Sequence, residues 1–285
     1  MDMIISGEQV ITRLKEELKE ALSSYNGTPH IGVVLNIEDK PSKSYIKSIT
    51  KVARDNGFRL TLYEVDSNSS EDEIKEIIQV LAKDDDVDGI IVTKPYAVRM
   101  KKEIINFIPR WKDIDGQTDA NIAALYKKEE GLFPATPLAV MEFFKEVNYQ
   151  LKGKHVVLIG RSRTVGLPLF HMLLSEDATC SICHSKTENL KEFTCRADVV
   201  ISAAGVPGLI TEDMVENATF LIDVAINVVG GKIVGDMAIN FEEKEYKEPG
   251  PIFITPVPGG VGPVTSYMLL LNTIKGMRKR GKLPR

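Results

Sequence analysis

Hydrophobic residues at helical spacing alternate with apolar runs typical of strands through the first third of the chain. Ser6 and Gln9 have the spacing of a capping box. Behind them Val10, Leu14 and Leu18 recur at helical spacing and predict an amphipathic helix. Further predicted strands cover 30–37, 59–65 and 89–93, and further predicted helices cover 43–56 and 71–83. Strands that alternate with helices at these distances indicate a parallel sheet.

A second alternating series follows Phe133-Pro-Ala-Thr-Pro137, a segment whose prolines suit a hinge. The predicted strands cover 156–159, 178–184, 197–205 and 220–227, and the predicted helices cover 138–148 and 264–279. We therefore predict an α/β fold with two lobes, each built on a mostly parallel sheet. In such sheets ligands bind at the carboxyl ends of the strands, which directs attention to residues 37–45, 93–97 and 111–116.

The segment around Gly160 has the layout of a dinucleotide-binding strand–turn–helix unit. Gly160 allows a sharp turn after a buried strand, and Gly166 allows the next helix to lie close and to leave its first N–H groups free for an anion. Pro168 fits the first helical turn. The spacing is Gly-x5-Gly and not Gly-x-Gly-x-x-Gly, so a plain strand-to-helix turn stays an open interpretation.

The next strand indicates which cofactor such a unit would hold. An NAD-specific fold usually ends this strand with a carboxylate that binds the ribose 2′-hydroxyl. Here the strand ends in His184-Ser-Lys-Thr187, without a carboxylate. Arg161, Arg163 and Lys186 are the cations available for a 2′-phosphate. The sequence therefore predicts NADP, in a Rossmann-type second lobe.

Three later segments are candidates for contact with a ligand. The strands 197–205 and 220–227 end in small or polar residues where a nicotinamide could lie. The loop 254–263 places three glycines among three prolines, which suits either a flat ligand against the backbone or a tight crossover.

Composition and charge narrow the class of protein. The chain has 285 residues, is 43% hydrophobic and carries a formal charge of −4, which argues against nucleic acid as the main partner. The basic end 278–285 is expected to be a solvated tail. No apolar run reaches membrane-spanning length and no signal pattern opens the chain, so we expect a cytoplasmic protein.

The cysteines and histidines predict no metal site. Three cysteines suit a reducing compartment. Cys180 and Cys183 form a CxxC inside a predicted strand, where they would point to opposite faces. The four histidines show no ligand spacing.

Taken together, these segments closely resemble the bifunctional methylenetetrahydrofolate dehydrogenase/methenyltetrahydrofolate cyclohydrolase family. The most specific motifs are Ile254-Thr-Pro-Val-Pro-Gly-Gly-Val-Gly-Pro-Val-Thr265, Gly160-Arg-Ser-x-x-Val-Gly-x-Pro168 and Cys183-His-Ser-Lys-Thr187. Lys112-Asp-Ile-Asp-Gly116 and the helix carrying Tyr45 add weaker support.

The resemblance implies a folate substrate in the cleft between the lobes, NADP on the second lobe, and a homodimer. It implies a folate-binding domain of residues 1–136 with the C-terminal helix 264–285, and an NADP-binding domain of residues 137–263. The predicted catalytic residues are Tyr45 and Asp115, which match the family pattern, and Lys94, which that pattern does not contain. The implied substrate-binding residues are Tyr45, Thr93, Asp115, Pro258, Gly259 and Gly260. The implied cofactor-binding residues are Gly160, Arg161, Ser162, Val165, Gly166, His184, Ser185, Ala204, Gly205 and Ile226. Within these sets Asp115 matches the aspartate that holds the pterin ring, and Arg161 and Ser185 match the 2′-phosphate contacts.

The chain departs from the family pattern where proton transfer is expected. The family has Tyr-Val-x-x-Lys-x-Lys, with the first lysine catalytic, and here that position holds Ile49. The supporting glutamine of Val-Gln-Leu-Pro is Thr93, and Lys94 stands beside it. Lesser changes are Ala135 for a cysteine and Ala225 for a glycine.

Hydride transfer needs alignment, whereas hydrolysis of the methenyl cation needs a group that titrates near neutral pH. Ile49 cannot supply one. The sequence therefore predicts an NADP-dependent methylenetetrahydrofolate dehydrogenase with weak or absent cyclohydrolase activity. The alternatives are the full bifunctional enzyme with Lys94 as the amine, and a folate- or NADP-binding protein without catalysis. A shikimate-type dehydrogenase is a further alternative, against which the loop 254–263 argues.

Overall fold

The computed structural model describes residues 4–94, 96–97, 102–239 and 253–284. By its internal contacts the chain divides into two compact units. One contains Leu14–Ala135 and Ser266–Arg285, and we call it the three-stranded lobe. The other contains Met1–Arg13 and Thr136–Thr265, and we call it the five-stranded lobe. Pro95 of the Thr93–Pro95 motif lies outside the described residues.

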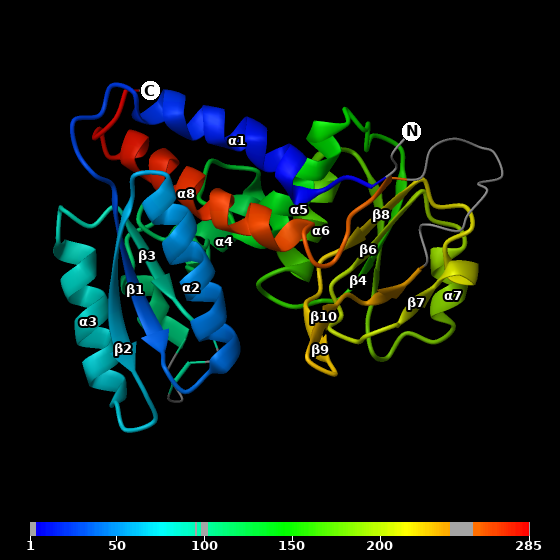
Figure 1. Cartoon of the computed structure of the whole chain (residues 1–285), viewed down its shortest axis with the longest axis horizontal. Helices are drawn as coiled ribbons and strands as arrows, with labels where there is room; N and C mark the ends of the chain where they lie inside the picture. Colours follow the sequence, from blue (N-terminus) through cyan, green and yellow to red (C-terminus); the bar gives the residue numbers. More distant parts are fainter. Residues whose placement is uncertain (1–3, 95, 98–101, 240–252, 285) are drawn as a thin grey trace. The chain divides into compact units, whose positions relative to one another are not determined.

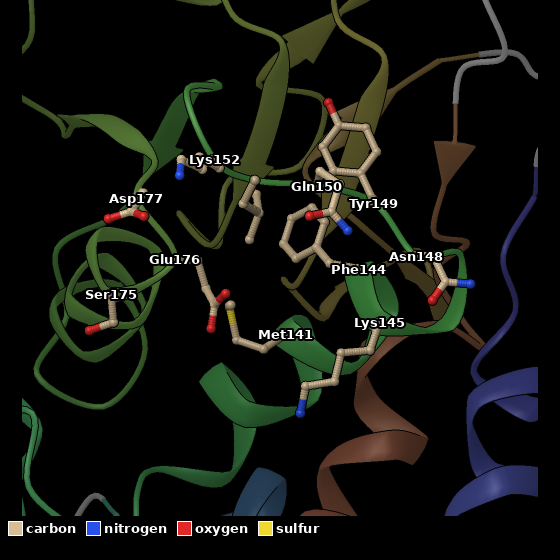
Figure 2. Close-up of a pocket in the computed structure, with 11 residues that line it drawn as sticks. Met141, Phe144, Lys145, Asn148, Tyr149, Gln150, Lys152, Ser175, Glu176 and Asp177 are labelled. Carbon is tan, nitrogen blue, oxygen red and sulfur yellow. The ribbon is translucent and has the colours of Figure 1, made fainter.

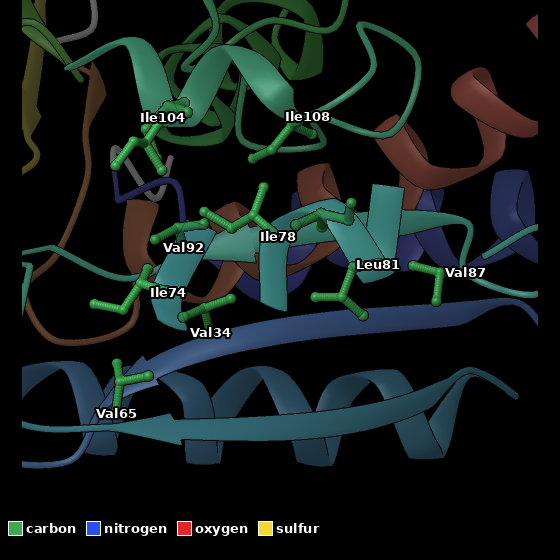
Figure 3. Close-up of a cluster of buried hydrophobic side chains, with 11 residues drawn as sticks. Val34, Val65, Ile74, Ile78, Leu81, Val87, Val92, Ile104 and Ile108 are labelled. Carbon is green, nitrogen blue, oxygen red and sulfur yellow. The ribbon is translucent and has the colours of Figure 1, made fainter. Parts of the chain in front are cut away.

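The three-stranded lobe is built on a parallel sheet with the strand order β2-β1-β3. Helices α2 and α3 lie on opposite faces of this sheet (Figures 1 and 3). The strands are β1 (His30–Asn36), β2 (Arg59–Val65) and β3 (Gly89–Val92). The helices are α1 (Gly7–Leu22), α2 (Lys40–Asp55), α3 (Glu71–Lys83), η1 (Lys102–Phe107), α4 (Asp119–Lys127) and the end of α8 (Val261–Lys279).

An apolar core fixes α3 and η1 to this sheet (Figure 3). Ile74, Ile78 and Leu81 recur at helical spacing on α3, and each is at most 1% exposed. Ser70 caps this helix and pairs with Glu73 in a full capping box. The remaining buried members of the cluster are Val34, Val65, Val87, Ile90, Val92, Ile104, Ile105 and Ile108.

The five-stranded lobe has a parallel sheet with the order β12-β8-β6-β4-β5, in which the chain reverses direction across the sheet at β4 and β6. The strands are β4 (His155–Ile159), β5 (Thr179–Cys183), β6 (Val199–Ser202), β8 (Phe220–Asp223) and β12 (Phe253–Ile254). Smaller elements are β7 (Ile210–Thr211), β9 (Asn227–Val229), β10 (Lys232–Val234), β11 (Met237–Ala238) and η2 (Glu212–Met214). The helices are α5 (Ala135–Glu146), α6 (Gly166–Ser175) and α7 (Leu190–Thr194).

The start of the chain belongs by contact to the five-stranded lobe. Ile4 bridges to Ile254 in parallel, and the N–H of Ile5 donates to the carbonyl of Ile254 at 2.8 Å. The N–H of Gly7 donates to the carbonyl of Gly259 at 2.7 Å. These backbone bonds extend the sheet edge at β12.

The predicted α/β fold with mostly parallel sheets is confirmed. The expectation of a solvated basic end was wrong. Arg280 and Lys282 both form ion pairs with Asp88, at 2.9 and 2.7 Å, and Asp88 is 2% exposed at its side chain. Leu283 is buried as well. The basic residues are therefore held in place by a buried carboxylate of the same lobe.

Candidate active site

A tight turn presents Asp115 at the edge of the three-stranded lobe where β3 ends. Gly116 has a φ of +61°, and a Cβ there would meet the backbone of Phe133 and Pro134 at 2.6 Å, so only glycine fits. Asp113 is buried and accepts the backbone N–H groups of Gln117 and Thr118 at 3.0 and 2.8 Å. This buried carboxylate closes the turn that carries Asp115.

The Asp115 carboxyl has an unusual electrostatic environment. Burial raises its pKa from 3.8 to about 6, and the neighbouring Asp113 adds to this shift. The Gln117 amide, which donates to Oδ2 of Asp115, and the charge of Lys94 act in the opposite direction. At neutral pH the group is ionised and ready to accept hydrogen bonds from a ligand.

The structure brings the three predicted catalytic side chains into one electrostatic cluster. Burial, and then the charge of Asp115, raise the pKa of the Tyr45 hydroxyl. The same two causes raise the pKa of Tyr96 to about 12. Lys94 is exposed, lies with Nζ 5.8 Å from the Tyr96 ring centroid, and lowers the pKa of Asp115. Asp115 therefore interacts electrostatically with both Tyr45 and Lys94, although the three residues lie on separate segments.

Helix α2 sets the position of Tyr45. Asp39 caps the helix by accepting the N–H of Ser42 at 2.8 Å, and the Ser42 hydroxyl donates to the carbonyl of Lys94 at 3.0 Å. Ile49 is 0% exposed, one turn beyond Tyr45, which is 37% exposed. Lys47 and Lys51 are exposed. The position of the family's catalytic amine is therefore filled by a buried aliphatic side chain.

Thr93 and Lys112, two further residues of the motifs, serve the fold. The Thr93 hydroxyl accepts the N–H of Asn36 at 3.0 Å and donates to the carbonyl of Val34 at 3.3 Å. Since Thr93 is 6% exposed, a contact of its hydroxyl with substrate stays a prediction. The Lys112 ammonium is 2.9 and 2.6 Å from the carbonyl oxygens of Ala82 and Asp84, so it caps the C-terminus of α3.

The glycine turn after β4 has the close backbone approach expected of a nucleotide-binding unit. Gly160 has a φ of +123°, and a Cβ there would lie 2.5 Å from the carbonyl oxygen of Ala203. A Cβ at Gly166 would lie 2.2 Å from the carbonyl oxygen of Gly160. Both positions therefore require glycine, which fits the dinucleotide interpretation of this turn.

One detail of the turn differs from the expectation. The first N–H groups of α6 are not free, because the Ser162 hydroxyl accepts the N–H of Val165 at 3.1 Å and that of Gly166 at 3.3 Å. Ser162 lies four residues before the first residue of the helix, and the Gly-x5-Gly spacing leaves room for its hydroxyl to accept these two N–H groups. An anion at this helix N-terminus would have to share or displace the serine hydroxyl.

Cationic side chains follow two neighbouring strands, with Arg161 and Arg163 after β4 and Lys186 after β5. Arg161, Arg163, Ser185 and Lys186 are all exposed. Within the described residues, the Arg161 guanidinium forms no ion pair with the protein. The turn is shaped by Thr187, whose hydroxyl accepts the N–H of His184 at 2.9 Å. Arginine and lysine at this strand end are suited to a phosphate group.

Three further predicted residues lie at the ends of β6 and β8. Ala204 is half-buried, while Gly205 and Ile226 are exposed. The carboxylate of Asp236 accepts the backbone N–H groups of Ala204 and Gly205 and so fixes the loop that carries them. Asp236 is fully buried, and it was not predicted from the sequence. The Gly235-Asp236 pair lies between short strands, and no motif or period in the sequence marks Asp236 as a buried carboxylate.

The proline-glycine loop after β12 is exposed at its tip. Pro258 and Gly259 are exposed, and the Val257–Pro258 peptide bond is cis. Gly260 is buried, and a Cβ there would lie 2.4 Å from the carbonyl oxygen of Pro256. The loop is therefore tight at Gly260, and contact of its exposed residues with a ligand stays a prediction.

A separate hollow of about 400 Å³ lies elsewhere in the five-stranded lobe (Figure 2). It is lined by Met141, Phe144, Lys145, Asn148, Tyr149, Gln150, Leu151, Lys152, Ser175, Glu176 and Asp177. These residues come from the end of α5, the approach to β4 and the end of α6, and none is a predicted site residue.

The described residues contain neither a metal-binding cluster nor a membrane-spanning helix. In that part of the chain no three histidine, cysteine or acidic residues are placed to hold a metal ion. No helix among the described segments is long and apolar enough to cross a membrane. Cys180, Cys183 and Cys195 are free thiols, and burial raises the pKa of Cys180 to about 11.

The chain combines a parallel Rossmann-type sheet that has a close glycine turn with a second parallel lobe that carries a carboxylate, a tyrosine and a lysine. These features define a two-lobed α/β enzyme of the dinucleotide-dependent class. The family model described as "Tetrahydrofolate dehydrogenase/cyclohydrolase, catalytic domain" matches residues 5–115. The model of the "NAD(P)-binding domain" of the same family matches residues 134–281. The chain belongs to the tetrahydrofolate dehydrogenase/cyclohydrolase family, as the motifs predicted.

Relatives match over nearly their whole length. The chain is 39% identical to the bifunctional protein FolD of Campylobacter hominis, with 98% of each chain covered. The crystal structure of the bifunctional dehydrogenase/cyclohydrolase FolD from Campylobacter jejuni has 40% identity and a TM-score of 0.89, with 96% of this chain and 98% of that chain covered. A Trypanosoma brucei dehydrogenase-cyclohydrolase, solved with NADP and an inhibitor, has 30% identity and a TM-score of 0.85, with 98% and 97% covered.

Proposed function

We propose that the chain catalyses NADP-dependent oxidation of 5,10-methylenetetrahydrofolate to the 5,10-methenyl form. The observation that carries this proposal is the cluster of Asp115, Tyr45 and Lys94 in the lobe that matches the family's catalytic domain. A carboxylate ionised at neutral pH accepts hydrogen bonds from the ring N–H groups of a pterin. We assign Leu14–Ala135 with Ser266–Arg285 to folate, and the five-stranded lobe to NADP.

The five-stranded lobe fits the cofactor. Gly160 and Gly166 leave no room for a Cβ, and Arg161 and Ser185 are exposed where a 2′-phosphate is expected. NADP supplies the hydride acceptor when it is bound. Asp115 would hold the pterin in register, and Tyr45 would pack against the folate. Alignment by these groups is the main requirement of the hydride step, because the folate nitrogen lone pairs drive the hydride out.

We propose that cyclohydrolase activity is weak or absent. Water attack on the methenyl cation needs a group that exchanges protons near neutral pH. Ile49 occupies the amine position and is fully buried, and the hydroxyl of Thr93 is already bonded to β1. Neither residue can move a proton to or from the substrate.

One observation favours the bifunctional alternative. Lys94 lies close enough to lower the pKa of Asp115, so an amine is present in the cluster although not at the family's position. The relatives named above are bifunctional proteins. Measuring NADPH formation from methylenetetrahydrofolate and hydrolysis of methenyltetrahydrofolate on purified protein separates the two. Absence of both activities would indicate a binding protein without catalysis.

Cofactor choice is expected to depend on Arg161. The Arg161→Ala change removes a charge-assisted contact to the 2′-phosphate worth about 1.5–3 kcal/mol, so the Kd for NADP should rise about tenfold or more while that for NAD hardly changes. Titration calorimetry of both nucleotides checks this. Arg196→Ala, an exposed arginine of the same lobe away from the β5 end, is the control. Equal affinity of the unmutated protein for NAD and NADP would contradict the assignment.

We also propose a cytoplasmic homodimer formed through the β9–β10 hairpin. Val228, Val229 and Ile233 of this hairpin are 72%, 51% and 48% exposed, which is a concentration of apolar surface on a short two-stranded ribbon. The Val228→Asp change should convert the dimer to a monomer in light scattering. Val80→Asp, at an apolar residue 57% exposed on α3, should leave the mass unchanged. A monomeric unmutated protein would disprove the proposal.

A further inference from the structure

The fully buried carboxylate of Asp236 is the hub of a hydrogen-bond cluster in the five-stranded lobe. Its Oδ2 accepts the Ser202 hydroxyl at 2.7 Å and the backbone N–H groups of Ala204 and Gly205 at 2.8 and 3.1 Å. Its Oδ1 accepts the N–H of Val206 at 2.7 Å and the Asn227 amide at 3.0 Å. All five partners donate, so the carboxylate lone pairs are fully used.

Asp236 is itself held from the end of β8. Asp223 is 4% exposed. Its carboxylate accepts the backbone N–H groups of Asp236 and Met237, the latter at 2.8 Å. A Cβ at Gly235 would lie 2.0 Å from Oδ2 of Asp223, so this approach depends on glycine. The end of β8 thus fixes the backbone at Asp236, and Asp236 fixes the loop after β6.

The loop that Asp236 holds is one of the predicted contacts of the cofactor. Its three successive N–H groups point at the buried carboxylate, although Gly205 and Val206 are exposed. Among the described residues no donor reaches the carbonyl oxygens of Ala204 and Gly205. These two oxygens can therefore accept a hydrogen bond from a ligand, and a carboxamide NH₂ is a donor that such oxygens bind.

We propose that Asp236 is a positioning residue for the nicotinamide half of the cofactor. It turns the N–H groups of residues 204–206 inward and so holds the carbonyl oxygens of Ala204 and Gly205 for the carboxamide. The β4–α6 turn and the β5 end, which are expected to hold the pyrophosphate and the adenosine half, make none of these five bonds. The inference rests on the proposed NADP-dependent function.

Binding of NADP and of 2′,5′-ADP, which lacks the nicotinamide half, tests this in calorimetry with the full chain. In Asp236→Asn an NH₂ group replaces one carboxylate oxygen and faces the N–H donors that this oxygen accepted. The loop after β6 should lose its position, so the Kd for NADP should rise about tenfold to a hundredfold. The Kd for 2′,5′-ADP should stay within about twofold. Combining Asp236→Asn with Asn227→Asp restores one donor–acceptor pair and should recover part of the NADP affinity.

The three-stranded lobe offers a matched control. Asp113 is also buried, accepts two loop N–H groups and accepts the Asn121 amide at 2.9 Å. Asp113→Asn should weaken folate binding and leave the NADP affinity unchanged. If Asp236→Asn does not fold, Asn227→Ala removes a single donor to the hub, and it should raise the Kd for NADP severalfold without changing that for 2′,5′-ADP.

Several outcomes would overturn the inference. Equal NADP affinity in the unmutated protein and Asp236→Asn would show that the loop position does not matter for the cofactor. Parallel loss of NADP and 2′,5′-ADP binding would show a general structural role. Failure of the unmutated protein to bind NADP would instead disprove the proposed function, and the inference with it.

Discussion

Replacing Asp115 with alanine is expected to weaken binding of tetrahydrofolate by roughly a hundredfold or more, because two or more charge-assisted hydrogen bonds to the pterin are lost together. NADP binding should be unchanged, since Asp115 lies in the three-stranded lobe. Fluorescence titration with tetrahydrofolate measures the first effect, and calorimetry with NADP measures the second. Asp119→Ala, an exposed aspartate at the start of α4, is the control.

The same residue links folate binding to pH. Burial raises the pKa of Asp115 to about 6, so the carboxylate is progressively protonated as pH falls through this value. Tetrahydrofolate affinity should then fall with each pH unit below about 6 in the unmutated protein. An affinity that stays constant down to pH 4.5 would show that an ionised Asp115 is not what holds the pterin.

Asp115→Asn provides the test of stability. A folded-state pKa above the unfolded value means that the native state favours the protonated form, so the contribution of Asp115 is fully present below pH 3.8 and is lost as pH rises through about 6. At pH 7 the ionised residue costs up to about 3 kcal/mol, and the asparagine variant should be more stable by up to that amount. Urea unfolding at pH 7 and pH 4 measures the difference, which should shrink at the lower pH. A variant less stable than the unmutated protein at pH 7 would show that Asp115 serves the fold.

The elements that hydrophobic periodicity determines were predictable from the sequence. The strand 59–65 and the helix 71–83 were predicted to the residue, because the apolar residues of the helix recur with a period of 3.6 that a strand does not share. Helix α4 was missed because its short apolar pattern is weak. The β9–β10 hairpin was missed although Gly230 and Gly231 form its turn, because its flanking segments are only three residues long.

Some residues of the candidate site were also predictable from the sequence, and others were not. Gly160, Gly166 and Asp115 were found because turn chemistry and motif spacing are local properties of the chain. Asp236 was not found, because its role arises only when β6, β8 and the strand β11 come together. The Ser162 cap and the ion pairs that Arg280 makes with Asp88 are tertiary in the same sense. Polar groups that satisfy distant backbone atoms leave no periodic signal.

The proton-transfer step should be restored only by two changes made together. Ile49→Lys would place an amine in a fully buried position, where desolvation lowers its pKa toward the range a proton-transfer group needs. Thr93→Gln would supply the supporting amide and lose the two hydroxyl bonds to β1. Methenyl hydrolysis in the double variant should exceed the sum of the single variants, whereas NADPH formation should change much less. Purely additive rates would show that the two positions do not act as a unit.

Lys94 decides between the two proposed activities. If the unmutated protein hydrolyses the methenyl substrate slowly, Lys94→Ala should change that rate little, and it should raise the pKa that governs folate binding because the ammonium lowers the pKa of Asp115. Lys47→Ala, at an exposed lysine of the same lobe, should move neither quantity. Fast hydrolysis that disappears in Lys94→Ala but survives in Lys47→Ala would make Lys94 the catalytic amine. It would also explain why Ile49 is tolerated, since a second lysine at position 49 would then be repelled by the first.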